Sequence, residues 1–451
     1  MSIISIALSG ANASRTAQNV TALNVANANT VGYTRQQAMQ ATMDGTGTSL
    51  GGVEVTSIRR VADDFIIAQM WASKSELGNA SYSMDSFGKL EQILGIDGYD
   101  ISAGMTEFFS SISESTTGPD STALRQQVVA KANSLAQRFS GLNNAIQELH
   151  QSLGNDRNSS VKTINELLGS IATNTESLIA AGGASAILED KRDLLINELS
   201  EQVDLEVYKG SGGELQLSLS NGQPLLINGN IGELQLTPLA SDPYQGTLNV
   251  TFNGNNYPVE NAIGGRLGAI ETSQKNDVIP VMDALDDMTV FLADSVNNAL
   301  AAGKDLNGNS PTTALFSYAA SNPAGTLVIN DLSPDELAFS QTGSPGDGGV
   351  LADLLAITDS TFPVTGYGNV SLDESFTAIT GDVAFSSRES QATFDSSSLL
   401  YEQIQSSREQ LSGVNSEEEA ANLMMYASSY QANMKVIGVA NDMFNTLLNA
   451  F

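Results

Sequence analysis

Both ends of the chain carry apolar and small residues at the spacing of a coiled coil. At the N-terminal end the stripe consists of Ile3, Ile6, Gly10, Ala13, Ala17, Val20, Asn24 and Asn27. At the C-terminal end it consists of Leu423, Ala427, Tyr430, Met434, Ile437, Asn441, Phe444 and Leu448. A mean spacing of about 3.5 residues keeps such a stripe on one side of a helix. The pattern predicts a coiled-coil-like terminal domain over residues 1–40 and 412–451.

The middle of the chain is patterned as long helices. Heptad-spaced apolar residues run from Val128 to Leu153 and, after a polar break at 155–160, from Ile164 to Leu178. This pattern is typical of a helical bundle. We expect the bundle to cover residues 41–205 and 265–411, with a mostly irregular, turn-rich segment at 304–395.

A different pattern separates the two parts of this bundle. Apolar and polar residues alternate over 206–264, and Asn-Gly pairs interrupt this alternation at 221–222, 228–229 and 253–254. Alternation predicts strands, and Asn-Gly is a preferred hairpin turn. Val53, Val55 and Ile58 indicate one further short strand. The fold class expected is mainly α with an inserted antiparallel β domain, an α+β multidomain protein.

Charge narrows the possible partners. The 451-residue chain has a formal net charge of −31, which disfavours binding to nucleic acid or to anionic membrane surfaces. Both ends are nearly uncharged: residues 1–53 hold only Arg15, Arg35 and Asp44 as charged residues, and residues 420–451 only Lys435 and Asp442. The ends are therefore expected to be buried, either against each other or against a partner.

No set of residues predicts catalysis, a metal site or a cofactor. There is no cysteine and a single histidine, His150, which lies in a heptad-patterned helix. Residues 47–51 match the G-x-S-x-G pattern of a nucleophile elbow, but a polar loop precedes them where a strand is required. Asp305 begins half of a calcium-loop pattern whose sixth and twelfth positions hold Ser310 and Phe316. We expect no enzyme and no apolar run long enough to span a membrane.

Short motifs near both ends of the chain, and one within its second half, resemble one family. Residues 23–36, LNVANANTVGYTRQ, are similar to the N-terminal signature of the flagellar rod, hook and hook-associated subunits. Tyr33-Thr34-Arg35 after Gly32 resembles the hook-associated protein 1 family most. The stretches SGVNSEEEAANL at 412–423, YQAN at 430–433, LLN at 447–449 and GKDLNGN at 303–309 match the same family.

The resemblance implies a structural subunit that joins the flagellar hook to the filament. It implies that the paired ends form an inner-tube domain, whose interface comprises the residues of the two stripes together with Gly32 and Tyr33. It also implies unfolded export by the flagellar type III system without a cleaved signal peptide, to an extracellular position at the hook–filament junction. The implied partners are neighbouring copies in a ring, the hook protein, the second hook-associated junction protein and a cytosolic export chaperone at the C-terminal helix.

Two other interpretations remain open from the sequence. The first is a hook or rod subunit, against which the run from Ser412 to Glu419 and the inserted β domain argue. The second is a surface adhesin or binding module that uses the β domain at 206–264. A ligand or partner captured by that domain alone would favour the second interpretation.

Overall fold

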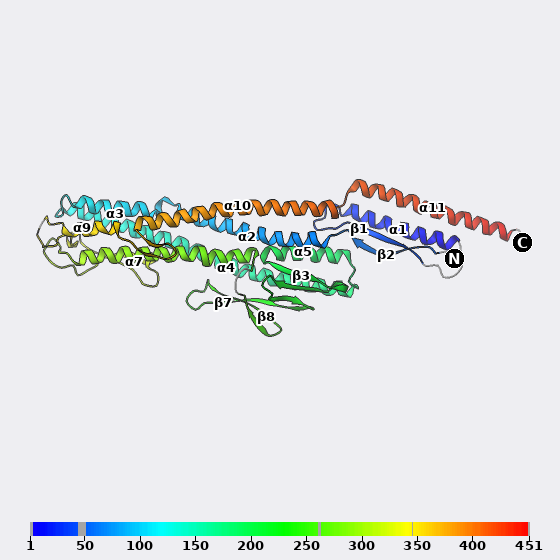
Figure 1. Cartoon of the computed structure of the whole chain (residues 1–451), viewed down its shortest axis with the longest axis horizontal. Helices are drawn as coiled ribbons and strands as arrows, with labels where there is room; N and C mark the ends of the chain where they lie inside the picture. The colour runs from blue at the N-terminus through cyan, green and yellow to red at the C-terminus, as the bar shows by residue number, and fades with distance from the viewer. Residues whose placement is uncertain (1–2, 44–50, 260–262, 345, 450–451) are drawn as a thin grey trace.

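The computed structural model describes residues 3–43, 51–259, 263–344 and 346–449. These residues form one long rod (Figure 1), and helices α1 (Ile3–Ala26) and α11 (Ser416–Leu448) lie side by side at one end of it. The structure is 64% helical, which confirms a mainly α fold with paired terminal helices and small antiparallel sheets.

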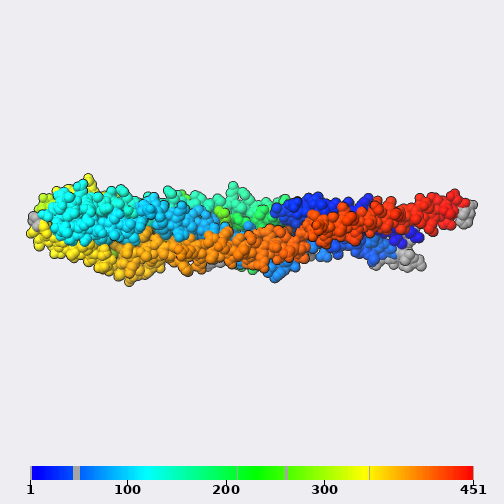
Figure 2. Space-filling view, turned by 90° about the horizontal axis from the view of Figure 1, so that it is seen from above, coloured from blue at the N-terminus to red at the C-terminus, as the bar shows by residue number. Residues whose placement is uncertain are grey.

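Three long helices build the body of the rod. They are α2 (Asp64–Leu94), α4 (Thr122–Ala180) and α10 (Leu372–Ser412). Helix α10 packs along α2 and leads directly to the terminal helices (Figure 2). The other helices are α3 (Ile101–Ser115), α5 (Ala186–Gln202), α6 (Gly265–Thr272), α7 (Ile279–Ala301), α8 (Pro323–Thr326) and α9 (Gly349–Ala356), with a π-helical turn at Ser273–Val278 between α6 and α7.

Helix α4 is continuous over 59 residues, so the break expected at 155–160 was wrong. The polar side chains there have partners on neighbouring elements. Arg157 pairs with Glu271 at 3.1 Å, and Ser160 donates a hydrogen bond of 2.8 Å to Gln202. A polar residue whose partner is supplied by another element does not need to interrupt a helix.

The irregular segment expected at 304–395 ends sooner than predicted, because α10 begins at Leu372. Ser371 and Glu374 form a capping box at its start, in which each side chain bonds the backbone of the other residue. Only a few positions of this long helix are buried, among them Phe376 and Ile379. The sparse apolar pattern explains why the first part of this helix, up to residue 395, was expected to be irregular. The segment before α10 contains strands β10 (Phe316–Ser317), β11 (Val328–Ile329), β12 (Phe362–Val364) and β13 (Gly368–Val370).

The inserted strands form two antiparallel sheets on one side of the rod (Figure 1). The first has the order β3-β4-β5-β6, with β3 (Leu205–Lys209), β4 (Leu215–Leu219), β5 (Pro224–Ile227) and β6 (Asn230–Ile231). The second has the order β7-β8-β9, with β7 (Glu233–Pro238), β8 (Gly246–Phe252) and β9 (Asn255–Pro258). Asn228 and Asn253 have positive φ, as do the glycines after them, which confirms two of the predicted turns. These sheets share one apolar core with α2, α4 and α5.

A hairpin connects the terminal helices to the body. Its strands are β1 (Gln36–Thr42) and β2 (Val53–Arg60), which pair antiparallel. Strand β2 confirms the strand predicted from Val53 to Ile58, whereas β1 was not predicted. Both strands pack on α1, so the chain turns back beside its own first helix before it enters α2.

Candidate assembly surface on the terminal helices

Helices α1 and α11 pack antiparallel over a surface of small residues. Asn24, near the end of α1, bonds Glu419 at the start of α11, whereas Gly10 lies against Asn433 farther along. A Cβ atom on Gly10 would lie only 2.8 Å from Oδ1 of Asn433, so the two helices are in close contact there. The alanine side chains that α1 buries are Ala7, Ala11, Ala13 and Ala17.

One face of α11 is partly buried, and we name it the inner stripe. It consists of Asn422, Tyr426, Tyr430, Asn433, Ile437 and Ala440. Its spacing of three and four residues is that of a coiled-coil seam. Because Asn433 contacts Gly10, this is the face that α11 turns toward α1.

A buried carboxylate ties the start of α11 to α1. The side chain of Glu419 is 2% exposed, and it accepts hydrogen bonds from Asn24 at 2.9 Å and from Arg35 at 2.8 Å. The amide of Asn24 also donates to the backbone carbonyl of Gln36, and its oxygen accepts from the Gln36 N–H and the Tyr33 hydroxyl. Every donor and acceptor of Asn24 is used in this way, so α1, the following turn and α11 meet at one residue.

Burial and nearby carboxylates shift the titration of this cluster. Burial, then Asp190 and then Glu419 raise the pKa of Tyr33 to about 12. Burial alone would lower the pKa of Arg35, but hydrogen bonds and charges from Glu418 and Glu419 hold it above its ordinary value. Tyr33 therefore remains a neutral donor, and Arg35 remains a cation between two α11 carboxylates.

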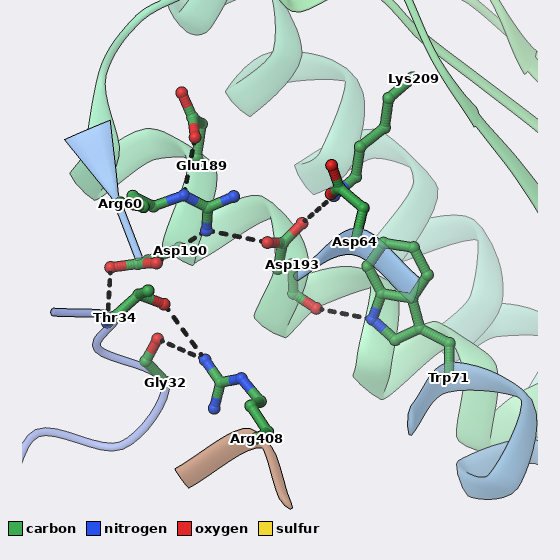
Figure 3. A network of polar contacts seen from close by, with 10 residues as sticks. All are labelled: Gly32, Thr34, Arg60, Asp64, Trp71, Glu189, Asp190, Asp193, Lys209 and Arg408. Carbon is green, nitrogen blue, oxygen red and sulfur yellow. Dashed lines mark hydrogen bonds and ion pairs between the residues drawn. The ribbon is translucent and has the colours of Figure 1, made fainter. Parts of the chain in front are cut away.

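A second polar network ties this end to the body of the rod (Figure 3). The Thr34 N–H donates to Asp190 of α5 at 3.0 Å, and Arg408 of α10 donates to the Gly32 carbonyl at 3.2 Å. Gly32 has a φ of +82°, the left-handed conformation that favours glycine. The turn that follows α1 is thus held by hydrogen bonds to both α5 and α10.

Arg60, at the end of β2, is the centre of that network. Its guanidinium pairs with Glu189 at 2.7 Å and with Asp190 and Asp193 at 2.8 Å each, and its side chain is 8% exposed. Burial would lower the pKa of Arg60, but Asp193 and Asp190 raise it well above its ordinary value. A fixed cation with three carboxylate partners favours a rigid joint.

The network continues from Asp193 to the β insert. The indole N–H of Trp71 donates to the Asp193 carbonyl at 3.2 Å, and Lys209 pairs with the Asp193 carboxylate at 3.1 Å and with Asp64 at 3.0 Å. The Lys209 ammonium also lies 5.0 Å from the centre of the Trp71 ring. Elements β2, α5, α2 and β3 therefore meet at this joint.

The residues predicted from the sequence to form the assembly interface fall into three groups according to their exposure to solvent. Those buried on α1 are Ala13, Ala17, Val20 and Asn24. Those partly buried are Ile6, Gly10, Asn27, Gly32, Tyr33, Ala427, Tyr430 and Ile437. Those exposed are Ile3, Leu423, Met434, Asn441, Phe444 and Leu448.

Sequence reasoning missed the polar residues that join these elements. The sequence patterns did not predict that Glu419, Arg35, Arg60 and Asp190 form contacts between elements. The isolated arginine at position 35, in a nearly uncharged N-terminal region, was the available indication of a buried acidic partner.

The described part of the chain has neither a metal-binding cluster nor a membrane-spanning helix. No cluster of three His, Cys, Asp or Glu side chains within it could hold a metal ion, and none of its helices is long and apolar enough to cross a membrane. His150 is buried and pairs with Asp242 of the β insert at 2.7 Å. Residues 47–50 of the candidate nucleophile elbow lie outside the described residues.

Comparisons with known proteins agree with this architecture. The family described as "Flagellar hook-associated protein FlgK helical domain" matches residues 87–316. Residues 4–34 match the family "Flagella basal body rod protein", and residues 405–450 match "Flagellar basal body rod FlgEFG protein C-terminal". The family matches thus cover both terminal helices and the part of the body between residues 87 and 316.

Relatives match along almost the whole chain. Flagellar hook-associated protein 1 of Salmonella typhimurium is 24% identical, and that of Escherichia coli (strain K12) is 22% identical, with 99% of each chain covered in both comparisons. The solved structure of the flagellar hook junction protein FlgK from Burkholderia pseudomallei aligns with a TM-score of 0.69 and 14% identity. That alignment covers 76% of this chain and 100% of the other, and it shows a shared fold.

Proposed function

This chain belongs to the FlgK family of flagellar hook-associated proteins, and we propose that it joins the hook of the bacterial flagellum to the filament. The family is structural, and the chain is a component of the flagellum. In this role the rod is a building block that holds its neighbours through its terminal helices.

The uncovered apolar surface of α11 carries this proposal. Residues 441–449 are all exposed, and Phe444 and Leu448 are 58% and 61% exposed. An exposed apolar surface of this kind marks an interaction site. The rigid joint at Arg60 would transmit the position of the bound terminal helices to the body of the rod.

The partners proposed are other axial subunits. They are neighbouring copies in a ring, the hook protein on one side, the second hook-associated junction protein on the other, and a cytosolic chaperone that covers α11 before export. Both predicted terminal stripes, with Gly32 and Tyr33, belong to this assembly domain. The proposed route is unfolded export through the flagellar type III channel without a cleaved signal peptide, to the extracellular hook–filament junction.

Deletion of residues 413–451 tests the proposal. Helix α11 packs mainly on α1, so the body should keep its thermal melting transition. Cells that carry the deletion should export filament subunits but build hooks without filaments, which electron microscopy of isolated flagella would show.

The matched control is Lys435→Ala, a change of one exposed residue within α11. Control cells should swim on soft agar and carry filaments. Normal filaments in the deletion strain would contradict a role for this chain in joining hook to filament.

A further inference from the structure

The apolar core of the body is divided into two clusters along the rod (Figure 1). The far cluster lies away from the terminal helices and includes Tyr82 of α2 and Leu153 of α4. The near cluster lies toward the terminal helices and includes Trp71 of α2 and Val161 of α4. Helices α2 and α4 run unbroken through both clusters, so the division lies in their side chains. We name the zone between the clusters the waist. It comprises residues 72–81 of α2, residues 154–160 of α4 and the π-helical turn at Ser273–Val278.

Polar and small side chains occupy the buried positions of the waist. Those on α4 are Gly154, Arg157 and Ser160, and those on α2 are Ser73, Ser75, Gly78 and Ala80. The sequence pattern expected a break in α4 at 155–160, and in the structure the interruption falls in the apolar core instead of in the helix. Interdigitated apolar side chains resist movement between helices, and a zone with few of them has low local stability.

Hydrogen bonds and one ion pair connect the elements at the waist. Arg157 pairs with Glu271 of α6 and donates to the Tyr244 carbonyl of the β insert, both at 3.1 Å. Gln274 of the π-helical turn donates to the same carbonyl at 2.8 Å. The side chains that make these bonds are long and have several rotatable bonds. They can keep their partners through small displacements that would disrupt close apolar packing.

The helices themselves are weakened at this level of the rod. A π-helical turn separates α6 from α7, and each long helix contains a glycine here: Gly78 in α2, Gly154 in α4 and Gly381 in α10. Burial and then the charge of Asp382 raise the pKa of Asp277 in the π-helical turn, so α10 passes that turn next to Gly381. Glycines inside helices lower helix stability, and π-helical turns are sites where helices kink.

Helix α10 crosses the waist with little packing. Val383 belongs to the far cluster, and Tyr401 and Ile404 pack partly buried against the near cluster. Of the described residues between Val383 and Tyr401, Ser390 alone is buried. The helix therefore connects the two clusters without holding them in one fixed orientation.

We propose that the body of the rod bends at the waist, with the two apolar clusters moving as rigid halves. The long helices stay continuous, and the bend is concentrated where glycines, polar contacts and the π-helical turn replace apolar packing. The joint at Arg60 lies outside the waist, so the terminal helices move together with the near half. The inference concerns the body alone and does not depend on the role proposed at the hook–filament junction.

Distances between pairs of spin labels test the bend in the purified full chain. The chain has no cysteine of its own, so labels attach only to introduced ones. The pair across the waist is Asn298→Cys of α7 with Thr247→Cys of β8, both at exposed positions. Pulsed electron resonance should give a distance distribution that is broader by about twofold or more than those within each half.

The pairs within the halves are matched controls at exposed positions. They are Asn298→Cys with Asn133→Cys in the far half, and Thr247→Cys with Glu176→Cys in the near half. Equal widths for all three pairs would overturn the proposal.

Gly381→Ala stiffens the waist without a clash, because no atom lies within 4 Å of the added Cβ. It should narrow the distribution across the waist and slow amide exchange at residues 379–387 by about two- to fivefold. Gly169→Ala is the matched control, a glycine of α4 outside the waist that also has open space around it. An unchanged distribution in Gly381→Ala, or the same narrowing in Gly169→Ala, would contradict bending at this level.

Amide hydrogen exchange along α4 supplies a measurement that needs no substitution. Residues 154–160 should exchange faster than residues 139–149 and 164–171 on either side, although all of them belong to one helix. Uniform protection along α4 would show that the two clusters behave as one core, and it would overturn the proposal.

Discussion

Replacing Glu419 with alanine removes the buried carboxylate that joins α11 to α1. The side chain accepts hydrogen bonds from Asn24 at 2.9 Å and from Arg35 at 2.8 Å, and it is 2% exposed. We therefore expect Glu419→Ala to release the first turns of α11 while the body of the rod stays folded.

The structure sets the size of this effect. A buried ion pair that loses one partner typically costs about 3–5 kcal/mol, and a hydrogen bond to a charged group is worth about 1.5–3 kcal/mol. The lower range applies here, because Arg35 is 22% exposed and keeps Glu418 at 3.1 Å. We expect a loss of about 2–3 kcal/mol, which raises the open population of α11 by a factor of roughly 30–150.

Amide hydrogen exchange on the purified full chain measures this population directly. Protection of residues 416–430 should fall by the same factor, and the disulfide between Gly10→Cys and Asn433→Cys should form more slowly. Thermal melting of the body should not change, because its core lies elsewhere.

Glu418→Ala is the matched control, since Glu418 also pairs with Arg35 but its side chain is 55% exposed. It should change protection by about 0.5 kcal/mol or less. Equal exchange rates in the Glu419→Ala and Glu418→Ala variants would refute the reasoning that burial makes Glu419 the stronger tie.

Three further changes test the body of the rod. Arg60→Leu leaves three carboxylates without their cationic partner and should lower the free energy of unfolding by about 3–5 kcal/mol in urea titrations. Arg59→Leu is the control and should leave the free energy of unfolding unchanged. Burial, then Asp382, raises the pKa of Asp277 from 3.8 to about 7, so the native state loses stability as the pH rises through that range. Asp277→Asn should therefore raise the melting temperature at pH 8 and change it little at pH 4. The Phe139 side chain is 0% exposed in the helical core. Phe139→Ala should leave a cavity there and lower the free energy of unfolding by about 3–5 kcal/mol, measured in the same titrations.

Local patterns were sufficient to predict most of α4 and the strands of the β insert. The heptads from Val128 to Leu153 place apolar side chains on one side of a helix whatever packs there, and the Asn-Gly turns need only their own backbone conformations. The motifs at both ends also pointed to the flagellar family, which the comparisons support. These features depend on residues close together in the chain, so the sequence contains them in full.

Polar contacts between distant residues were decided by the tertiary structure alone. Arg157 does not interrupt α4, because Glu271 and the β insert supply its partners, and Glu419 is buried because Asn24 and Arg35 surround it. A hydrogen-bond partner that lies far away in the chain leaves no periodic trace in the sequence.

The division of α11 into two faces was also decided in three dimensions. The sequence predicted one apolar stripe, in which Tyr430 and Ile437 do lie on the face toward α1. Met434 lies off that face. Phe444 and Leu448 lie in the last part of the helix, where all residues from 441 to 449 are exposed. Helical periodicity places residues on a common face, but only the extent and rotation of the neighbouring helix determine which face is covered.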